Sequence, residues 1–234
     1  MIDIRPREGL GAFANDWLDS RFHFSFAEYH DRARMGWGKL RVWNDDRIRA
    51  GTGFDTHPHR DMEIITYVRS GAITHTDSMG NRGRTAEGDV QVMSAGTGVM
   101  HAEHNLEDGD TTLFQIWILP DARGHAPAWA TRRFPGEEKS GRLVVLASGR
   151  EAERAAGALP INQDAAVLGA TLRARETVRH RLGATRHGYL VPAAGTVTVN
   201  GAALGTGDGA AIADEDEIVV TATTDAEIVL VDVP

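Results

Sequence analysis

The sequence predicts an all-β protein made of two antiparallel β-barrels in tandem. Short runs rich in Val, Ile and aromatic residues, separated by Gly, Asn and Asp, recur from Lys39 to the end of the chain. This pattern is typical of strands joined by tight turns. Helical periodicity is weak by comparison. In addition, two segments of the chain repeat one another, which indicates two copies of one unit.

The clearest strand predictions are runs of apolar and β-branched residues bounded by turn formers. They span residues 38–43, 62–68, 115–119, 142–146 and 228–233. No segment carries a sustained helical period, so helices are expected only as short pieces. The candidates are residues 16–18, 126–129 and 151–156.

The internal repeat lies around residues 71–90 and 195–210. In each copy a glycine precedes a strand, and a Gly-Asp pair further on leads into the next strand. Asn200-Gly201 predicts a tight hairpin turn in the second copy, because both residues tolerate positive φ. We therefore divide the chain into an N-terminal barrel at 1–131, a linker at 132–141 and a C-terminal barrel at 142–234.

The composition is that of a folded protein without membrane segments. Of the 234 residues 41% are hydrophobic and 25% are charged, the net charge is -8, and there is no cysteine. The negative charge argues against direct nucleic-acid binding, and the lack of cysteine removes disulfides and thiolate chemistry. The first residues include acids and Pro6 where a signal peptide needs an apolar core. No run of about 18 apolar residues occurs, so we expect a cytoplasmic protein that does not cross a membrane.

Two pairs of metal-binding residue types stand out in the N-terminal half. His57 and His59 are two residues apart, as are His101 and Glu103, and residues at this spacing on a strand project to one face. Three imidazoles and a carboxylate suit iron, manganese, nickel, copper or zinc, and leave coordination positions open. In the alternative interpretation, His57 and His59 lie in a solvated turn and His101 packs in a core.

The residues around these pairs resemble a known family. Gly-x5-His-x-His-x3-Glu at residues 51–63 and Gly-x2-His-x3-Asn at residues 98–105 resemble the two sequence boxes of the cupin superfamily. THPHRDME at 56–63, DSMGN at 77–81 and QVMSAGTGVMHAE at 91–103 are more specifically similar to bacterial pirin-related proteins.

This resemblance implies a bicupin, in which two jelly-roll barrels of the double-stranded β-helix type follow one another. It also implies one divalent metal ion per chain, held in the N-terminal barrel by residues matching His57, His59, His101 and Glu103. Iron(II) is the expected ion, with nickel, manganese, copper, cobalt and zinc as alternatives. Ordinary cupins use the carboxylate at the position of Glu63 instead. With Glu103 as the ligand, Glu63 is expected to orient an imidazole N–H.

The C-terminal half offers no His-x-His pair. We expect His180 and His187 to be surface or packing residues, and the C-terminal barrel to lack a metal site. The alternating aromatic residues Phe22, Phe24 and Phe26 are expected in the barrel core rather than in a substrate-binding wall. No organic cofactor site is predicted, because the Gly-x-Gly segments lack the strand-loop-helix context of nucleotide-binding loops.

The function that the resemblance implies is oxygen-dependent ring cleavage of a flavonol such as quercetin. The expected partners are a small phenolic substrate and dioxygen, with Glu103 as general base for the substrate hydroxyl. One alternative is a metal-binding regulatory protein without turnover, similar to pirins that act as co-regulators through a protein partner. Another is a cupin isomerase or hydrolytic enzyme that works with zinc and without oxygen.

Overall fold

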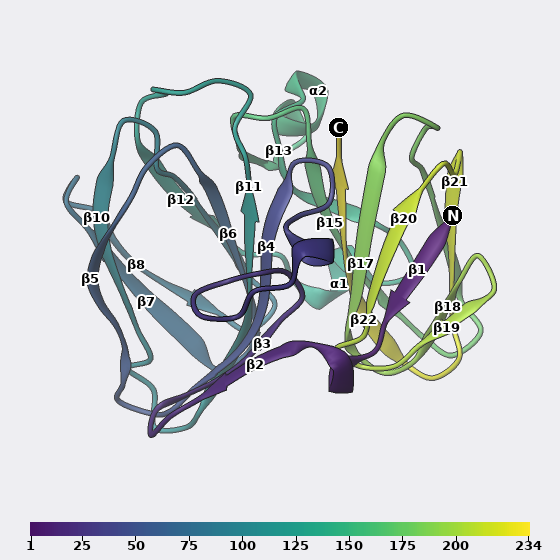
Figure 1. Cartoon of the computed structure of the whole chain (residues 1–234), viewed down its shortest axis with the longest axis horizontal. Coiled ribbons are helices and arrows are strands. Elements are labelled where there is room, and N and C mark those ends of the chain that lie inside the picture. The colour runs from purple at the N-terminus through teal and green to yellow at the C-terminus, as the bar shows by residue number, and fades with distance from the viewer.

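The computed structural model describes residues 1 to 234 and shows two β-barrels side by side (Figure 1). Each barrel combines a seven-stranded sheet with a four-stranded sheet. The named strands pair antiparallel, except that β13 and β14 are parallel. The predicted all-β bicupin architecture is confirmed.

In the N-terminal barrel the large sheet has the strand order β12-β9-β6-β11-β4-β3-β2. Its members are β2 (Gly11–Ala14), β3 (Leu18–Phe22), β4 (Leu40–Ile48), β6 (Glu63–Ser70), β9 (Val90–Ser94), β11 (Thr111–Ile118) and β12 (Ala128–Arg132). The small sheet has the order β5-β10-β7-β8. Its members are β5 (Gly53–His59), β7 (Ala72–Asp77), β8 (Arg82–Ala86) and β10 (Val99–His104).

The C-terminal barrel has a large sheet with the order β1-β20-β17-β22-β15-β13-β14. Its members are β1 (Ile2–Arg5), β13 (Val144–Ser148), β14 (Leu159–Pro160), β15 (Ala166–Leu172), β17 (His187–Ala194), β20 (Gly209–Ala213) and β22 (Ala226–Val233). The small sheet has the order β16-β21-β18-β19. Its members are β16 (Thr177–Arg181), β18 (Val197–Val199), β19 (Ala202–Leu204) and β21 (Glu217–Ala222).

Helices are few and short. The α-helices are α1 (Gly136–Lys139) and α2 (Glu151–Ala155), and single 3-10 turns occur at Arg7–Gly9 and Arg32–Arg34. The helix predicted at 151–156 is confirmed as α2. The other two helix predictions are wrong: residues 16–18 lead into β3 and residues 126–129 into β12, because sheet pairing overrides weak local preference. No helix has the length and apolar character needed to cross a bilayer.

The predicted repeat is visible in the turns as well as in the strand order. Gly71 before β7 and Gly195 before β18 have φ of 75° and 74°, and Gly88 and Gly207 before the next matching strands have 77° and 80°. Such positive φ values favour glycine, which explains why these residues recur. Asn200-Gly201 also forms the predicted hairpin turn, with φ of 45° and 89° between β18 and β19.

The start of the chain crosses to the other barrel. Residues of β1 pair with β20, from Ile2 opposite Ile212 to Arg5 opposite Gly209. This differs from the predicted division of the chain, which placed residues 1–131 in the N-terminal barrel. The pairing could not be inferred locally, because a single short strand carries no signal for which sheet it joins.

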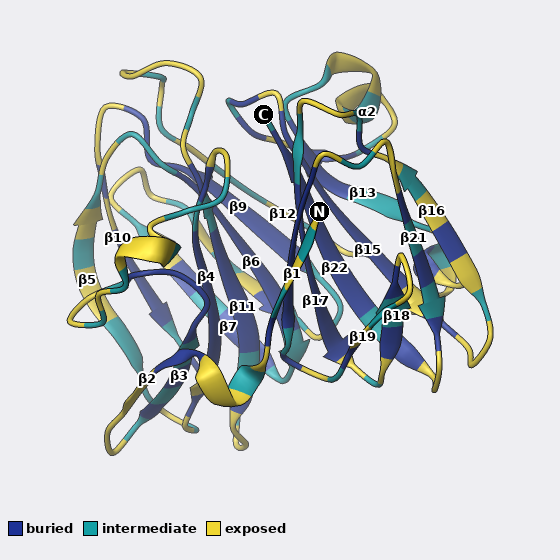
Figure 2. Cartoon of the chain, turned by 45° about the vertical axis from the view of Figure 1, so that its right-hand side comes forward, coloured by how far each residue is buried: buried dark blue, intermediate teal, exposed yellow.

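Four buried clusters show how the barrels are filled. The largest contains 24 buried residues from both large sheets, among them Trp43, Phe114 and Val229, and joins the barrels. A second, of 18 residues, fills the C-terminal barrel. The N-terminal barrel has interior clusters of only five and four residues. In Figure 2 the strands where the two barrels meet, such as β4, β17 and β22, are accordingly dark blue along most of their length.

Candidate metal centre

Strand β5 carries the first histidine pair at the edge of the small sheet. His57 and His59 both border a cavity inside the N-terminal barrel, and His57 lies opposite His101 of β10. Pro58 between them cannot donate a backbone hydrogen bond, which an edge strand tolerates. His57 and His59 therefore project to the same face of β5, as their two-residue spacing predicts.

The second pair lies on β10, opposite an irregularity in β5. The register shifts between His101, opposite His57, and Glu103, opposite Phe54, so β5 contains an extra residue. Bulges of this kind re-aim side chains beside functional sites. Gly53 makes the close approach feasible, because a Cβ there would lie only 2.2 Å from the backbone oxygen of Glu103. His101 and Glu103 both border the cavity and are both buried.

The imidazoles of His57, His59 and His101 form a cluster whose ligand atoms all lie within 4.8 Å of one another. The Nε2 atoms of His57 and His101 are 3.1 Å apart. Two nitrogens at about 2.0 to 2.1 Å from one ion are separated by about 3 Å, so this spacing fits a shared metal. His57 Nδ1 lies 2.7 Å from the Asp55 carbonyl oxygen and donates to it, which leaves Nε2 free to act as a ligand.

The electrostatics of the cluster also favour metal binding. Burial lowers the pKa of His59 to about 4, with a further contribution from His57. Burial likewise lowers the pKa of His101 to about 3, and the neighbouring His57, His59 and His75 act in the same direction. Both imidazoles are therefore neutral near neutral pH, which is the form that coordinates a metal. The donor set fits a divalent transition metal.

Glu103 lies beside this cluster in a polar setting. Its carboxylate belongs to a second group of ligand atoms with His75 and His101, all within 4.8 Å of one another. Gln91 Nε2 donates to Oε1 at 2.5 Å and Gln115 Nε2 donates to Oε2 at 2.6 Å. Burial raises the pKa of Glu103 to about 7, against the effect of these hydrogen bonds. Its assignment as the fourth ligand stays a prediction.

Glu63 occupies a different place from the one predicted. Its carboxylate accepts hydrogen bonds from Ser94 Oγ at 2.5 Å and from Asn162 Nδ2 at 3.1 Å, and none from an imidazole. The prediction that Glu63 orients a histidine N–H is therefore wrong. The chain turns between the two positions: β5 ends at His59, Asp61 has φ of 47°, and Glu63 begins β6.

His75 is a site residue that the sequence did not identify. It is fully buried, and its Nδ1 lies 3.4 Å from His101 Nδ1, on the side of the ring opposite His57. Its Nε2 is 3.0 Å from Asp77 Oδ2, and its ring stacks on Trp129 at 4.9 Å. His75 thus fixes the orientation of His101. The signal was present, because His75 and Asp77 form a third pair two residues apart.

The cavity beside the cluster has a volume of about 510 Å³. Most of its apolar lining is aromatic and comes from Phe13, Trp17, Phe22, Phe26, Phe54 and Trp117. Trp117 meets His59 edge to face, with ring centroids 4.9 Å apart, so this wall continues directly into the histidine cluster. Phe22 and Phe26 border the cavity, contrary to our expectation of a packed core for them, whereas Phe24 does pack in the core between the barrels.

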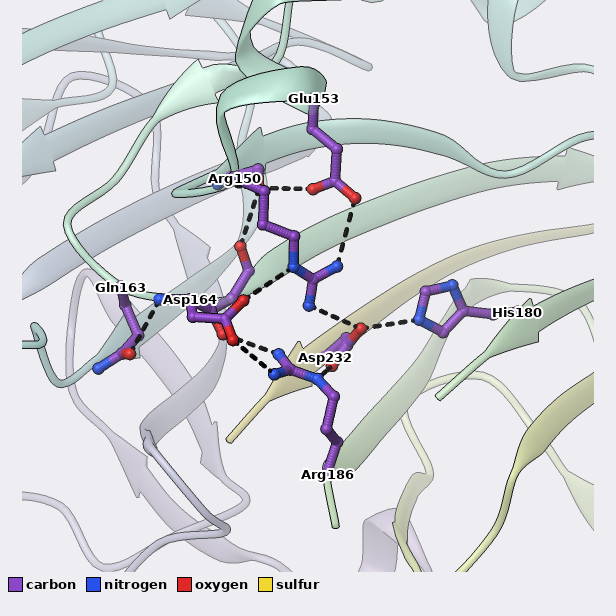
Figure 3. A network of polar contacts seen from close by, with 9 residues as sticks. Arg150, Glu153, Gln163, Asp164, His180, Arg186 and Asp232 are labelled. Atoms are coloured by element: carbon purple, nitrogen blue, oxygen red, sulfur yellow. Dashed lines mark hydrogen bonds and ion pairs between the residues drawn. The ribbon is translucent and has the colours of Figure 1, made fainter. Parts of the chain in front are cut away.

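The C-terminal histidines have structural partners. His180 Nε2 lies 2.9 Å from Asp232 Oδ2, and Asp232 also bonds to Arg150 and Arg186 (Figure 3). The His187 ring meets Trp37 edge to face, with centroids 5.4 Å apart. The two histidines therefore belong to separate packing environments. A single metal ion per chain stays a prediction.

The chain is similar to proteins of known sequence and structure along its whole length. The Pirin family matches residues 4–118, and the quercetinase C-terminal cupin domain matches residues 145–233. A pirin-like protein of Caulobacter vibrioides is 59% identical over 232 residues, which is 99% of each chain. The quercetin 2,3-dioxygenase of Escherichia coli strain K12 is 42% identical and covers 100% of this chain and 99% of its own.

Among solved structures, the bacterial pirin YhhW from Escherichia coli in complex with nickel(II) superposes with a TM-score of 0.92. It is 41% identical, and the match covers 100% of this chain and 99% of that one. The similarity therefore extends over both barrels.

Proposed function

The chain belongs to the pirin family, and on that premise we propose that it is a metal-dependent dioxygenase that opens the ring of a flavonol such as quercetin. One observation carries the proposal: the three-histidine cluster borders an aromatic-walled cavity of about 510 Å³. Drug-sized ligands occupy pockets of about 300 to 1,000 Å³, so a flat three-ring molecule is of suitable size. Names of relatives, including a quercetin 2,3-dioxygenase, support the same reaction class.

His57, His59 and His101 would hold one divalent ion, with Glu103 as the fourth ligand. The neighbouring pirin that binds nickel(II) supports a divalent metal, while iron(II) remains our expectation for this chain. When bound, the ion supplies Lewis-acid and redox chemistry for a substrate hydroxyl and dioxygen.

The protein residues position the substrate and handle its proton. The aromatic wall around Phe22, Phe26 and Trp117 would bind the flat rings and exclude water from the reacting carbon atoms. A carboxylate oxygen of Glu103 would accept the proton of the flavonol 3-hydroxyl as general base. Gln91 and Gln115 hold the two oxygens of that carboxylate in place.

The test is turnover of quercetin by protein that has been stripped of metal and reloaded with iron(II). We expect oxygen uptake matched by release of one carbon monoxide per flavonol opened. The stripped protein serves as the control and should be inactive.

Two other outcomes would overturn the proposal. Full metal occupancy with no consumption of flavonols would favour a metal-binding regulatory protein. Turnover that continues without oxygen would indicate isomerase or hydrolytic chemistry.

A further inference from the structure

A polar strip lies on the large sheet of the N-terminal barrel, across the cavity from the histidine strand. Strand β4 supplies it, because Asn44 and Asp46 both border the cavity. Asp45 between them points away and forms ion pairs with Arg7 and Arg69. Successive side chains of a strand point to opposite faces, so Asp45 lies on one face of β4 and Asn44 and Asp46 face the cavity on the other.

Asp46 is a buried carboxyl group without an ion pair. It is 2% exposed, and its one hydrogen bond comes from the hydroxyl of Ser20, which pairs with it across β3 and β4. That bond uses Oδ1, and Oδ2 takes part in no hydrogen bond. Burial raises its pKa to about 7, and the nearby acids Asp45 and Glu103 act in the same direction. A carboxyl group in such a setting is adapted to receive a hydrogen-bond donor.

Asn44 provides a second unused acceptor. The side chain is 4% exposed, and its Oδ1 is buried without a hydrogen-bond partner. Buried polar atoms in folded proteins almost always have a partner, so an orphan acceptor on a cavity wall indicates a missing ligand group. Asn44 and Asp46 are two residues apart on one strand, so both acceptors face the same ligand.

The remaining surfaces of the cavity define the shape of that ligand. Phe26 packs against Phe22 at 5.3 Å and against Trp117 at 5.4 Å between ring centroids, and Trp117 in turn meets His59, so an aromatic wall runs from the histidine cluster to β3. A ligand that spans the cavity must therefore be flat and apolar in its middle. It needs one polar group at the histidines and hydrogen-bond donors at Asn44 and Asp46.

We propose that Ser20, Asn44 and Asp46 form a recognition site for ring hydroxyl groups of a polyhydroxylated aromatic substrate, with Asn44 Oδ1 and Asp46 Oδ2 as the acceptors. Ser20 orients Asp46 and does not contact the substrate. The site selects among substrates by the ring hydroxyl groups that do not face the metal. The inference rests on the proposed function for the identity of the ring system, but it concerns binding rather than turnover.

The experiment compares two flavonols that differ in the ring hydroxyl groups that would reach Asn44 and Asp46. Quercetin carries hydroxyls on all its rings, whereas 3-hydroxyflavone keeps only the one that faces the metal in the proposed function. Binding is followed by quenching of the cavity tryptophans Trp17 and Trp117, with metal-free and metal-loaded protein. Asp46→Asn replaces the acceptor Oδ2 by a donor, and Asn44→Leu removes the orphan acceptor.

We expect each variant to bind quercetin about tenfold more weakly, which is the loss typical of a hydrogen bond to a partly charged or buried acceptor. Binding of 3-hydroxyflavone should change by less than about twofold, which also reports that the cavity is intact. Ser20→Ala should show a smaller loss in the same direction. Asp19→Asn, on the neighbouring position of β3 and paired with Arg21, should bind both flavonols as the wild type does.

Equal losses for the two flavonols, or no loss for either, would overturn the inference, as would failure of the wild-type protein to bind quercetin. The outcome is separable from the proposed function. Discrimination without any turnover would leave the recognition site standing and refute the dioxygenase. If the protein turns over quercetin but the variants do not distinguish quercetin from 3-hydroxyflavone, the dioxygenase stands and the recognition site is refuted.

Discussion

The two barrels share one strand order but differ in what they enclose. β10 and β21 occupy corresponding places, each second in a four-stranded sheet. β10 directs His101 and Glu103 inward, whereas β21 buries Ile218 and Val220. Most of the strand pairing and the glycine turns before matching strands recur in both, so they define the barrel, and the interior residues decide whether it carries chemistry.

The difference extends to packing. The C-terminal interior is filled by 18 buried residues, while the N-terminal interior is divided by a cavity of about 510 Å³. A hollow, polar interior buries less apolar surface and is less stabilising. The core of 24 residues between the large sheets offsets this, because it anchors the hollow barrel to the filled one.

Buried carboxylates show the same contrast. Burial alone would raise the pKa of Asp232, but hydrogen bonds from His180 and Arg186 and the charge of Arg150 outweigh it, and the pKa is lowered (Figure 3). Asp46 lacks such partners, and its pKa is raised to about 7. The C-terminal barrel therefore neutralises its buried charge internally, and the N-terminal barrel leaves acceptors for a ligand.

The largest expected effect is on metal affinity, and it should differ between substitutions in the two barrel interiors. His101→Ala removes a proposed ligand, and metal affinity should fall by more than about 100-fold, since loss of an outer partner alone costs about 10 to 100-fold. Ile218→Val, at a position of β21 buried in the other barrel, should keep the metal and lose about 1 kcal/mol of stability. Metal analysis and denaturant unfolding measure both. Metal loss in Ile218→Val would show that metal binding depends on the interior of the C-terminal barrel as well.

Asp232→Asn should destabilise the protein by about 1 to 3 kcal/mol at neutral pH, because Arg150 and Arg186 lose their buried partner and keep only more exposed acidic ones. The pKa of Asp232 is lowered on folding, so its contribution is full above the ordinary value of 3.8 and is lost as pH falls further. Unfolding curves should therefore show the difference between variant and wild type shrinking at acid pH. A difference independent of pH would argue against this charge network.

Asp46→Asn should act in the opposite sense. Its pKa is raised from 3.8 to about 7 on folding, so the ionised carboxylate costs stability as pH rises between these values. The variant should match the wild type near pH 4 and exceed it near pH 8, by up to about 4 kcal/mol. Thermal unfolding across this range tests it. The variant should be more stable and bind quercetin more weakly, which is the trade-off between stability and function expected at a functional residue.

Metal retention should also distinguish the two glutamates. Glu103→Gln removes an anionic donor and should lower metal retention markedly, whereas Glu63→Gln changes only contacts with Ser94 and Asn162 and should keep the metal. Metal content after dialysis against a weak chelator ranks the variants. The reverse ranking would mean that the site is built like that of an ordinary cupin.

The features that the sequence predicted are those that depend on local spacing. The His57 and His59 pair, the repeated glycines and the Asn200-Gly201 turn each follow from backbone geometry over a few residues. The polar strip could not be predicted in this way. Asn44, Asp45 and Asp46 form a polar run in the sequence that is typical of a turn, yet they lie in the middle of β4, where the cavity and Arg69 accommodate them.

The sequence missed His75 and gave Glu63 the wrong role for a related reason. Whether each approaches the cluster depends on a register between strands or on a turn that breaks strand parity, as at Asp61. Such features arise from tertiary pairing, which a single sequence does not specify.

The most direct test of the account is the metal content of the purified protein and two matched histidine variants. We predict about one ion per chain in the wild type, a sharp loss in His59→Ala and no change in His187→Ala, because His59 belongs to the cluster and His187 packs on Trp37. Close to two ions per chain, or equal losses in both variants, would contradict the claim that only the N-terminal barrel carries the metal centre.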